Sequence, residues 1–256
     1  MSIVVNGTNL KSATFNGQDV DSIYYNGSLV WELPPEIQLI SGIQSDGKAW
    51  IQTDFGSENF NYSQDPNTIS YAGYVDIRYH FEKKLDKNIG RKAVALFTNA
   101  NESIQNNELC KCSFGVNSGN GGHIIASLAE SRASVIGPEI SNYYDEYRIS
   151  CYGKLNRLSF YYNKYPSSSE GTNIIANTTP TFELSPHKYQ ILKGGDETLH
   201  KNFILHSIEF GYLNDKVNRF LQPAIMKRKG VETVGLYDAK RGIFYGPQEG
   251  SFIPHY

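Results

Sequence analysis

The sequence predicts an all-β protein in which a small N-terminal β-meander module precedes an antiparallel β-sandwich. Three observations predict this class. Asn-Gly pairs recur every ten residues near the start, alternating hydrophobic segments separated by polar turns fill the rest, and Tyr (18) and Phe (13) far outnumber Met (2). Aromatic residues favour strands, and no segment carries a convincing capped amphipathic helix.

The first thirty residues align as three units, "IVVNGTNLKS", "ATFNGQDVDS" and "IYYNGSLVWE". Asn-Gly favours a type I′ hairpin turn because both central residues need a positive φ. A ten-residue period leaves about four residues for each strand, which is short for an antiparallel strand. Such a unit is marginally stable alone, so we expect it to pack on something else.

The repeat ends at Trp31, and the segment "ELPPEI" follows it. Pro34-Pro35 favours a stiff, extended connector because each proline pushes the residue before it out of the α region. The sequence therefore predicts two domains, a repeat module over 1–33 and a sandwich over 34–256.

From residue 37 onward the pattern is almost uniformly that of strands, as in "AWIQTDF", "RKAVALF" and "LNRLSFYYN". Many strands with turns every 10–15 residues are typical of a two-sheet antiparallel sandwich. In "YVDIRYHFEKK" the side chains separate by strand periodicity. The apolar face is predicted to carry Val75, Ile77, Tyr79 and Phe81, and the solvated face Asp76, Arg78, His80 and Glu82.

Composition excludes several classes of function. The net charge is −2 and the pI about 6.3, so the overall charge does not favour binding to nucleic acid. No window approaches the roughly 18 apolar residues that a membrane span needs. The opening "MSIVVNGTNL" lacks a secretory pattern, so we expect folding in the cytoplasm of the producing cell. Three cysteines (Cys110, Cys112 and Cys151) are too few for a disulfide framework and are predicted to be free thiols.

Three segments resemble a known group of domains. The segment "LISGIQSDGKAWIQTDF" (Leu39–Phe55) resembles the opening of concanavalin A-like, laminin-G-like domains in phage and prophage structural proteins. Two later segments resemble the end of the same domains, namely "FILHSIEFGYLNDKVNRFLQPAI" (Phe203–Ile225) and "VGLYDAKRGIFYGPQEGSF" (Val234–Phe252). Residues 56–200 match only in pattern. The resemblance implies a concanavalin A-like β-sandwich, or jelly roll, from a virion tail, fibre or head-appendage protein.

The same resemblance extends to the repeat, because "NGSLVW" is similar to small Asn-Gly modules at the N-termini of such virion proteins. It implies that the module attaches or oligomerises the protein. The residues that carry this expectation are Asn6, Gly7, Asn16, Gly17, Asn26, Gly27 and Trp31.

The closing segment also has a physical interpretation. "GLYDAKRGIFYG" predicts a strand, a turn over residues 238–242 and a second strand, with Leu236 and Tyr237 facing Phe244 and Tyr245. A C-terminal strand that closes a sandwich must pair with its N-terminal strand. These motif residues indicate core and turn positions rather than a binding site.

The sequence offers no set of catalytic residues. Glycoside hydrolysis needs two carboxyl groups facing one cleft, whereas Asp76 and Glu82 belong to a solvated strand face and Asp145 and Glu146 point to opposite sides. Nucleotide-binding and zinc-protease motifs are missing. The segments 63–67 and 213–215 could supply calcium ligands, but the same residue types are ordinary turn formers. The segment "MKRKG" (226–230) is expected to be a solvated turn. We predict a non-enzyme without catalytic, cofactor or metal residues.

Tyrosines concentrate in the polar loops, most densely in "SNYYDEY" (141–147). A tyrosine offers a rigid apolar ring and a hydroxyl, which suits sugar rings and protein contacts alike. Tyr143, Tyr144 and Tyr147 are therefore candidate glycan contacts. The alternative is that they pack inward.

The function expected from these observations is that of a structural protein of a tailed bacteriophage, a fibre or appendage subunit that displays the sandwich to host-surface glycans. We expect a location in the virion after assembly in the host bacterial cytoplasm, contacts with other virion proteins, and a homo-oligomer, with a trimer favoured. The alternatives are a capsid or tail decoration protein without a ligand, and a glycan-active enzyme or lectin on the same fold.

Overall fold

The computed structural model describes residues 4–5, 8–9, 13–15, 18–20, 22–25, 28–56, 73–83, 97–98, 112–117, 123–128, 134–139, 147–154, 157–164, 172–177, 188–193, 201–211 and 219–256. Within these ranges every regular element is a β-strand, and the central strands pair in antiparallel fashion. A search of the same ranges for a helix of sufficient length and hydrophobicity to cross a membrane found none.

The N-terminal repeat forms three antiparallel hairpins. They are β1 (Val4–Val5) with β2 (Thr8–Asn9), β3 (Ala13–Phe15) with β4 (Gln18–Val20), and β5 (Ser22–Tyr25) with β6 (Ser28–Glu32). The innermost partners are Val5↔Thr8, Phe15↔Gln18 and Tyr25↔Ser28. In each hairpin two residues separate the innermost partners, a spacing consistent with the predicted turns. The Asn and Gly residues themselves lie outside the described residues.

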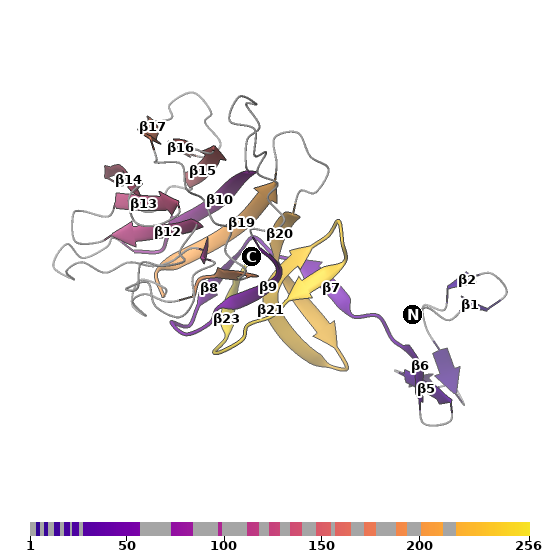
Figure 1. The fold of residues 1–256 in the computed structure, drawn as a ribbon. Coiled ribbons are helices and arrows are strands. Elements are labelled where there is room, and N and C mark those ends of the chain that lie inside the picture. The colour runs from indigo at the N-terminus through magenta and orange to yellow at the C-terminus, as the bar shows by residue number, and fades with distance from the viewer. Residues whose placement is uncertain are drawn as a thin grey trace. The chain divides into compact units, whose positions relative to one another are not determined.

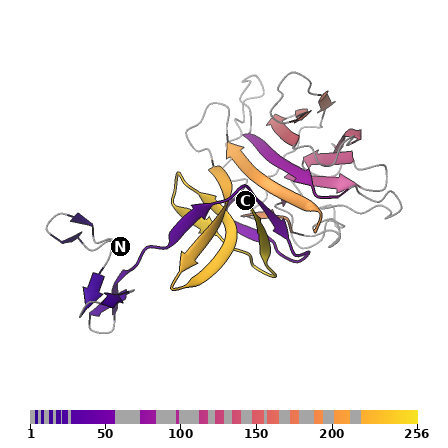
Figure 2. The same cartoon turned by 180° about the vertical axis from the view of Figure 1, so that it is seen from behind.

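The main sheet is built around β10 (Gly73–Phe81), which pairs with β15 (Tyr147–Lys154) on one side and β19 (Phe203–Gly211) on the other. Figures 1 and 2 show these neighbours from opposite sides. The order continues outward through β16 (Arg157–Lys164) to β17 (Thr172–Asn177), and through β20 (Arg219–Arg228) and β21 (Val231–Asp238) to β22 (Ile243–Tyr245). Off this path, β7 (Glu36–Leu39) pairs with β20, and β8 (Gly42–Ser45) pairs with β19 and β23 (Phe252–His255).

Two smaller sheets complete the described strands. One contains β11 (Phe97–Thr98), β18 (Lys188–Ile191) and β9 (Ile51–Gly56), and the other β12 (Cys112–Asn117), β13 (His123–Leu128) and β14 (Ser134–Glu139).

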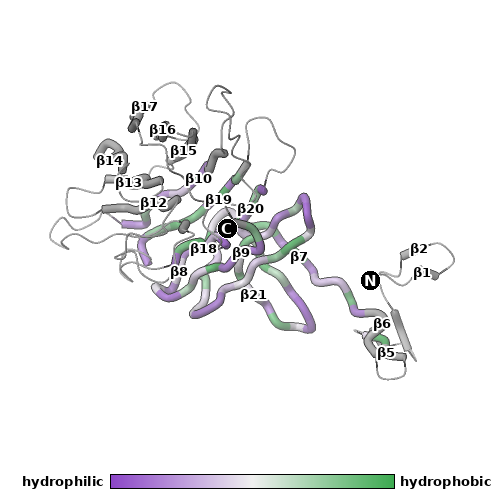
Figure 3. The backbone as a smooth tube through the Cα atoms, viewed as in Figure 1, coloured by the Kyte–Doolittle hydropathy of each residue, from purple (hydrophilic) through white to green (hydrophobic). Residues whose placement is uncertain are grey.

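Aromatic side chains join the β9–β18 sheet to the main sheet. The ring of Phe210 on β19 lies 5.0 Å from Phe55 on β9 and 5.1 Å from Tyr189 on β18. All three rings are buried, and aromatic rings of this kind bury about 150–250 Å² each. Figure 3 shows hydrophobic stretches along the strands and hydrophilic residues at the connecting turns. Two antiparallel sheets thus enclose one core, and the predicted all-β, antiparallel sandwich class is confirmed.

Both predictions about the end of the chain are confirmed. The hairpin of β21 and β22 pairs Leu236 with Tyr245 and Tyr237 with Phe244, around a turn that begins at Asp238. The last strand, β23, pairs with β8, the first strand of the stretch predicted to open the sandwich.

The prediction for β10 is correct for three residues of its apolar face and wrong for one residue of its polar face. Ile77, Tyr79 and Phe81 are buried as expected. Asp76, however, is only 6% exposed, because β10 is a central strand in which Asp76 lies between Ser150 and Glu209. Central strands have neighbours on both sides, so strand periodicity alone does not predict exposure.

The chain divides into two compact units, one of residues 1–38 with 225–233 and the other of residues 39–224 with 234–256. The first unit contains the end of the hairpin formed by β20 and β21. Its turn lies at Lys229 and Gly230, which have φ values of 51° and 77°. The boundary predicted between residues 33 and 34 stays a prediction.

An ion-pair cluster lies inside the first unit. The carboxylate of Glu32, the last residue of β6, pairs with Arg228 and lies 3.1 Å from Nζ of Lys229. The solvated turn expected at 226–230 is observed, since residues 227–230 are exposed. Two of its basic side chains also have an acidic partner about 200 residues earlier in the chain.

Candidate functional site

The outward side of β9 carries a polar row. Ile51, Thr53 and Phe55 are buried, whereas Trp50 and Gln52 are partly exposed and Asp54 is exposed. Side chains alternate between the two faces of a strand. Trp50, Gln52 and Asp54 therefore share the face of β9 opposite to its buried side chains.

Strand β18 supplies a second row beside the first. It runs antiparallel to β9, with Ile191 opposite Ile51 and Gln190 opposite Gln52. Tyr189 and Ile191 are buried, and Lys188 and Gln190 are not. The polar face is defined here as Trp50, Gln52, Asp54, Lys188, Gln190 and Lys193.

Lys193 reaches this face through a break in the strand alternation. Leu192 has a φ of 59°, a left-handed conformation that non-glycine residues adopt uncommonly. It is buried directly after the buried Ile191. The next residue, Lys193, places its ammonium 4.3 Å from the centroid of the Trp50 ring. A cation over an aromatic face is attracted by the ring quadrupole.

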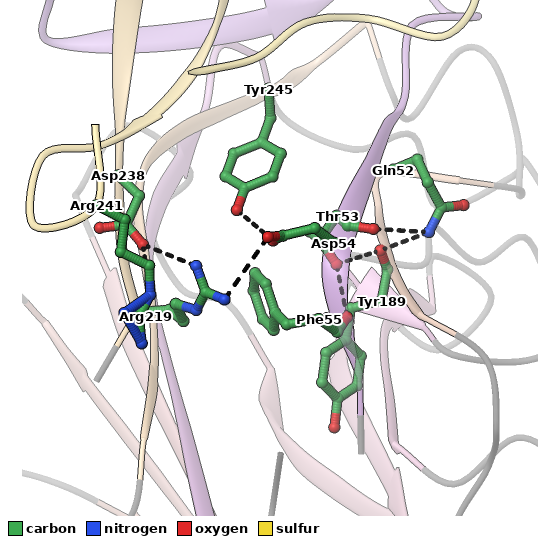
Figure 4. Close-up of polar contacts among 9 residues, drawn as sticks. All are labelled: Gln52, Thr53, Asp54, Phe55, Tyr189, Arg219, Asp238, Arg241 and Tyr245. Atoms are coloured by element: carbon green, nitrogen blue, oxygen red, sulfur yellow. Dashed lines mark hydrogen bonds and ion pairs between the residues drawn. The ribbon is translucent and has the colours of Figure 1, made fainter. Parts of the chain in front are cut away.

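Hydrogen bonds fix the two amides in the middle of the face. Nε2 of Gln190 donates to Oε1 of Gln52 at 3.1 Å. Nε2 of Gln52 in turn lies 3.3 Å from the carbonyl oxygens of Thr53 and Tyr189. Beneath them, the Thr53 hydroxyl lies 2.8 Å from the carbonyls of Phe55 and Tyr189. Figure 4 shows the contacts of Gln52 and Thr53 with Tyr189. Together with the bond from Gln190, they limit the rotamers available to Gln52.

Two groups orient the carboxylate of Asp54. The Tyr245 hydroxyl donates to Oδ1 of Asp54 at 2.5 Å, and Nη2 of Arg219 lies 3.7 Å from Oδ2. The Asp54 side chain is 50% exposed, whereas that of Arg219 is 12% exposed. Burial, and then the hydrogen bond to Asp54, raise the pKa of the Tyr245 phenol, so this hydroxyl stays a donor at neutral pH.

A buried carboxylate holds Arg219 from the other side. Asp238 is fully buried, and its Oδ2 lies 3.4 Å from Nη1 of Arg219 and 3.7 Å from Nε of Arg241. The Arg219 guanidinium also lies 4.8 Å from the centroid of the Phe55 ring. Arg219 therefore bridges Asp54 and Asp238, as Figure 4 shows. Such a buried network restricts a side chain to one geometry.

Hydrogen bonds to Asp238 stabilise the turn that follows this residue. Its carbonyl accepts hydrogen bonds from the backbone N–H of Arg241 and Gly242, and its Oδ1 accepts one from the backbone N–H of Lys240. Because this turn leads directly into β22, it fixes where Tyr245 meets Asp54.

The polar face is suited to binding rather than to acid–base chemistry at these groups. It combines an oriented carboxylate, two amides, two ammonium groups and an aromatic ring, which together donate and accept many hydrogen bonds. Glycoside hydrolysis requires two carboxyl groups on opposite sides of a bound sugar. Here Arg219 occupies the space between Asp54 and Asp238. Across the part of the chain with described side chains, no three His, Cys, Asp or Glu residues form a group that could hold a metal ion.

The site residues predicted from the sequence remain predictions. Tyr143 and Tyr144 lie outside the described residues. Tyr147 begins β15, where its backbone lies opposite Lys164 and Tyr79. In the predicted attachment module, Trp31 lies on β6 opposite Ile23, and the six Asn and Gly residues fall outside the description.

Sequence interpretation missed the polar face. The signal for one row was available, since "AWIQTDF" places Trp50, Gln52 and Asp54 at alternate positions. The other members, and the groups that orient Asp54, come from strands more than 130 residues away, and nothing in the sequence pattern pairs them.

Comparisons with known proteins give similarity in structure but not in sequence. No protein-family model matches the chain, and no curated protein does. Lectin II from Ulex europaeus is similar with a TM-score of 0.42 and 12% identity, over 75% of this chain and 96% of that one. The exoplasmic/lumenal domain of VIP36 in its Ca²⁺-bound form has a TM-score of 0.44 and 9% identity, over 72% and 85%. The Scytalido-glutamic peptidase, solved with a peptide-based transition-state analogue, has a TM-score of 0.34 and 10% identity, over 84% and 97%. These similarities assign no function to the chain.

Proposed function

We propose that the chain is a structural subunit of a tailed bacteriophage virion, a fibre or appendage protein that attaches through its N-terminal module and displays a glycan-binding β-sandwich. In this proposal it is a binding protein and not an enzyme. Its partners are other virion proteins and further copies of itself in a homo-oligomer, most simply a trimer. It is assembled in the bacterial cytoplasm and resides in the virion.

The observation that supports binding is the polar face, and above all the half-exposed Asp54. Tyr245 and Arg219 orient this carboxylate while leaving half of its side chain open to solvent. An oriented acceptor loses little conformational entropy when it captures a hydroxyl group.

Support for the virion assignment comes from the sequence segments that resemble phage structural proteins and from the hairpins of the repeat. Strands of two to five residues leave short unpaired edges. Three such hairpins have little core of their own, so they need a partner for stability. In the proposal this partner is a neighbouring virion protein or another subunit.

The virion assignment is tested with particles from the bacterium or phage that encodes the chain. Purified particles are probed with an antibody against the sandwich and examined by immunogold electron microscopy. We expect labelling at a regular position on each particle. Deletion of residues 1–33 should abolish labelling, while circular dichroism shows that the purified deletion variant is folded. Unlabelled wild-type particles, or full incorporation of the deletion variant, would contradict the proposal.

The alternatives make different predictions. A decoration protein without a ligand would be present on particles, but particles that carry Asp54→Asn would adsorb to cells at the normal rate. A glycan-active enzyme would release reducing ends from a host polysaccharide, which a colorimetric assay detects. We expect slower adsorption of the Asp54→Asn particles and no release of reducing ends.

A further inference from the structure

We propose that the polar face binds an uncharged, hydroxyl-rich glycan chain that lies along β9, from Trp50 at one end to Asp54 at the other. This inference deepens the proposed function, because it names the site and the class of ligand. It is nevertheless tested on the isolated protein, so it stands or fails separately from the virion assignment.

The length of the face suits an extended ligand. Trp50, Gln52 and Asp54 occupy alternate positions on one strand, and a strand rises about 3.3 Å per residue. Trp50 and Asp54 are therefore separated by about 13 Å along β9. Gln190 lies beside Gln52 in register, so polar groups continue between the two ends. A short oligosaccharide spans such a row, whereas a single small molecule contacts only part of it.

The donors and acceptors on the face match hydroxyl groups. A carboxylate has about four acceptor positions, and the bond from Tyr245 uses one position on Oδ1 of Asp54. The amide oxygen of Gln52 accepts one hydrogen bond from Gln190 and has a second lone pair. Each sugar hydroxyl both donates and accepts, so it can bridge an acceptor such as Asp54 and a donor such as Lys188.

The aromatic end of the face adds a different contact. Trp50 is partly exposed and carries the Lys193 ammonium 4.3 Å from its ring centroid. The ammonium covers one side of the ring, so the proposed sugar contact is made by the rest of its exposed apolar surface. This gives the face a direction, with apolar contact at Trp50 and hydroxyl capture at Asp54.

The distribution of charge favours an uncharged ligand. Lys188 and Lys193 on the face are accompanied by Asp54 and by Glu249, whose backbone bridges to Trp50. Behind the face, Arg219 and Arg241 share Asp238. Charges of both signs are thus present on and beside the face. The Asp54 carboxylate repels a strongly anionic chain, and the lysines repel a cationic chain. An uncharged chain therefore fits best.

The test uses the full chain. An array of neutral and uronic acid-containing oligosaccharides identifies a ligand. Calorimetry then measures the Kd of this ligand for the wild type, Asp54→Asn and Trp50→Ala. The charge-matched control is Glu232→Gln, because Glu232 is exposed on β21. We expect a neutral oligosaccharide to bind, Asp54→Asn and Trp50→Ala each to raise its Kd about tenfold or more, and Glu232→Gln to leave it unchanged. Thermal melting shows whether each variant is folded.

Two further readouts keep the test decisive if Trp50→Ala fails to fold. The Kd should change less than about twofold between 50 and 500 mM NaCl, because an uncharged ligand has no counterions to release. A conservative Gln52→Asn variant should weaken binding while the protein stays folded. Binding of acidic sugars only, a steep salt dependence, no binding to any neutral oligosaccharide, or wild-type affinity of Asp54→Asn would each overturn the inference. None of these outcomes would bear on the virion assignment, which the labelling of particles tests separately.

Discussion

Tyr245 and Asp54 lie 191 positions apart in the chain, and the Tyr245 hydroxyl donates a 2.5 Å hydrogen bond to the Asp54 carboxylate. This bond joins β22, the edge strand of the main sheet, to β9 of the smaller sheet. It therefore links the two layers of the sandwich directly at the polar face.

The first prediction concerns pH. The pKa of Tyr245 is raised, chiefly by burial, above that of an exposed tyrosine. Above about pH 10 the unfolded chain loses this proton while the folded protein retains it, so stability falls as pH rises. Tyr245→Phe should remove this contribution. Urea unfolding at pH 8 and pH 11 should therefore show a smaller alkaline loss of stability in the variant than in the wild type.

The control for that experiment is Tyr256→Phe, because the Tyr256 residue is 82% exposed. This variant should lose stability between the two pH values as much as the wild type does. Equal alkaline losses in the wild type and Tyr245→Phe would mean that the Tyr245 phenol is not buried beside Asp54 in solution.

The second prediction concerns the buried carboxylate of Asp238. Its replacement by alanine leaves Arg219, which is 12% exposed, without its buried partner. Removing one member of a buried ion pair costs about 3–5 kcal/mol, so Asp238→Ala should lower the free energy of unfolding by about 3 kcal/mol. Asp54→Asn, at the exposed end of the same network, should cost less than about 1 kcal/mol. Chemical denaturation of both variants measures the difference, and equal costs would contradict the network.

The third prediction concerns the close approach of β21 and β22. A Cβ atom added at Gly235 would lie 2.3 Å from the carbonyl oxygen of Tyr245 and 2.8 Å from Phe244. Because backbone must move to make room, Gly235→Ala should destabilise the protein by about 1–3 kcal/mol. It should also weaken any ligand of the polar face, since Tyr245 orients Asp54.

Gly230→Ala is the matched control for the third prediction. Gly230 has a φ of +77° but no atom within 4 Å of an added Cβ, so only backbone strain of about 1 kcal/mol is expected. If thermal melting shows Gly230→Ala to be the more damaging of the two, the packing of β21 on β22 is not as described.

The fourth prediction concerns the ion-pair cluster in the first unit. Lys229 and Arg228, which both hydrogen-bond to Glu32, hold its pKa below the usual range. A lowered carboxyl pKa contributes stability above about pH 4.3, which is lost as pH falls through the folded-state pKa. Glu32→Gln should raise amide hydrogen exchange in residues 225–233 at pH 7. Glu36→Gln, also on the first unit and exposed, should not.

Salt provides an independent check of the same cluster. Concentrated NaCl screens exposed charges, so 1 M NaCl should raise exchange in the wild type and leave Glu32→Gln nearly unchanged. Identical exchange in the wild type and Glu32→Gln under all conditions would show that Glu32 does not hold the hairpin turn in solution.

Local chemistry predicted much of this fold. The Asn-Gly pairs specify two-residue turns because few other residues adopt two consecutive positive φ angles, and the observed registers, such as Val5↔Thr8, agree. The alternation in "GLYDAKRGIFYG" set the pairing of Leu236 with Tyr245. Strand periodicity also predicted the buried positions Ile77, Tyr79 and Phe81.

Sequence by itself therefore determined the class of fold, the hairpins and the core faces of individual strands, because these depend on neighbours close in the chain. Only the tertiary structure decided that Asp76 is buried, that Glu32 meets Arg228 and Lys229, and that Gln190, Arg219 and Tyr245 converge on β9. Those outcomes depend on which distant strands become neighbours. Strand pairing across more than 130 residues is selected by the packing of the whole core, and no local pattern encodes it.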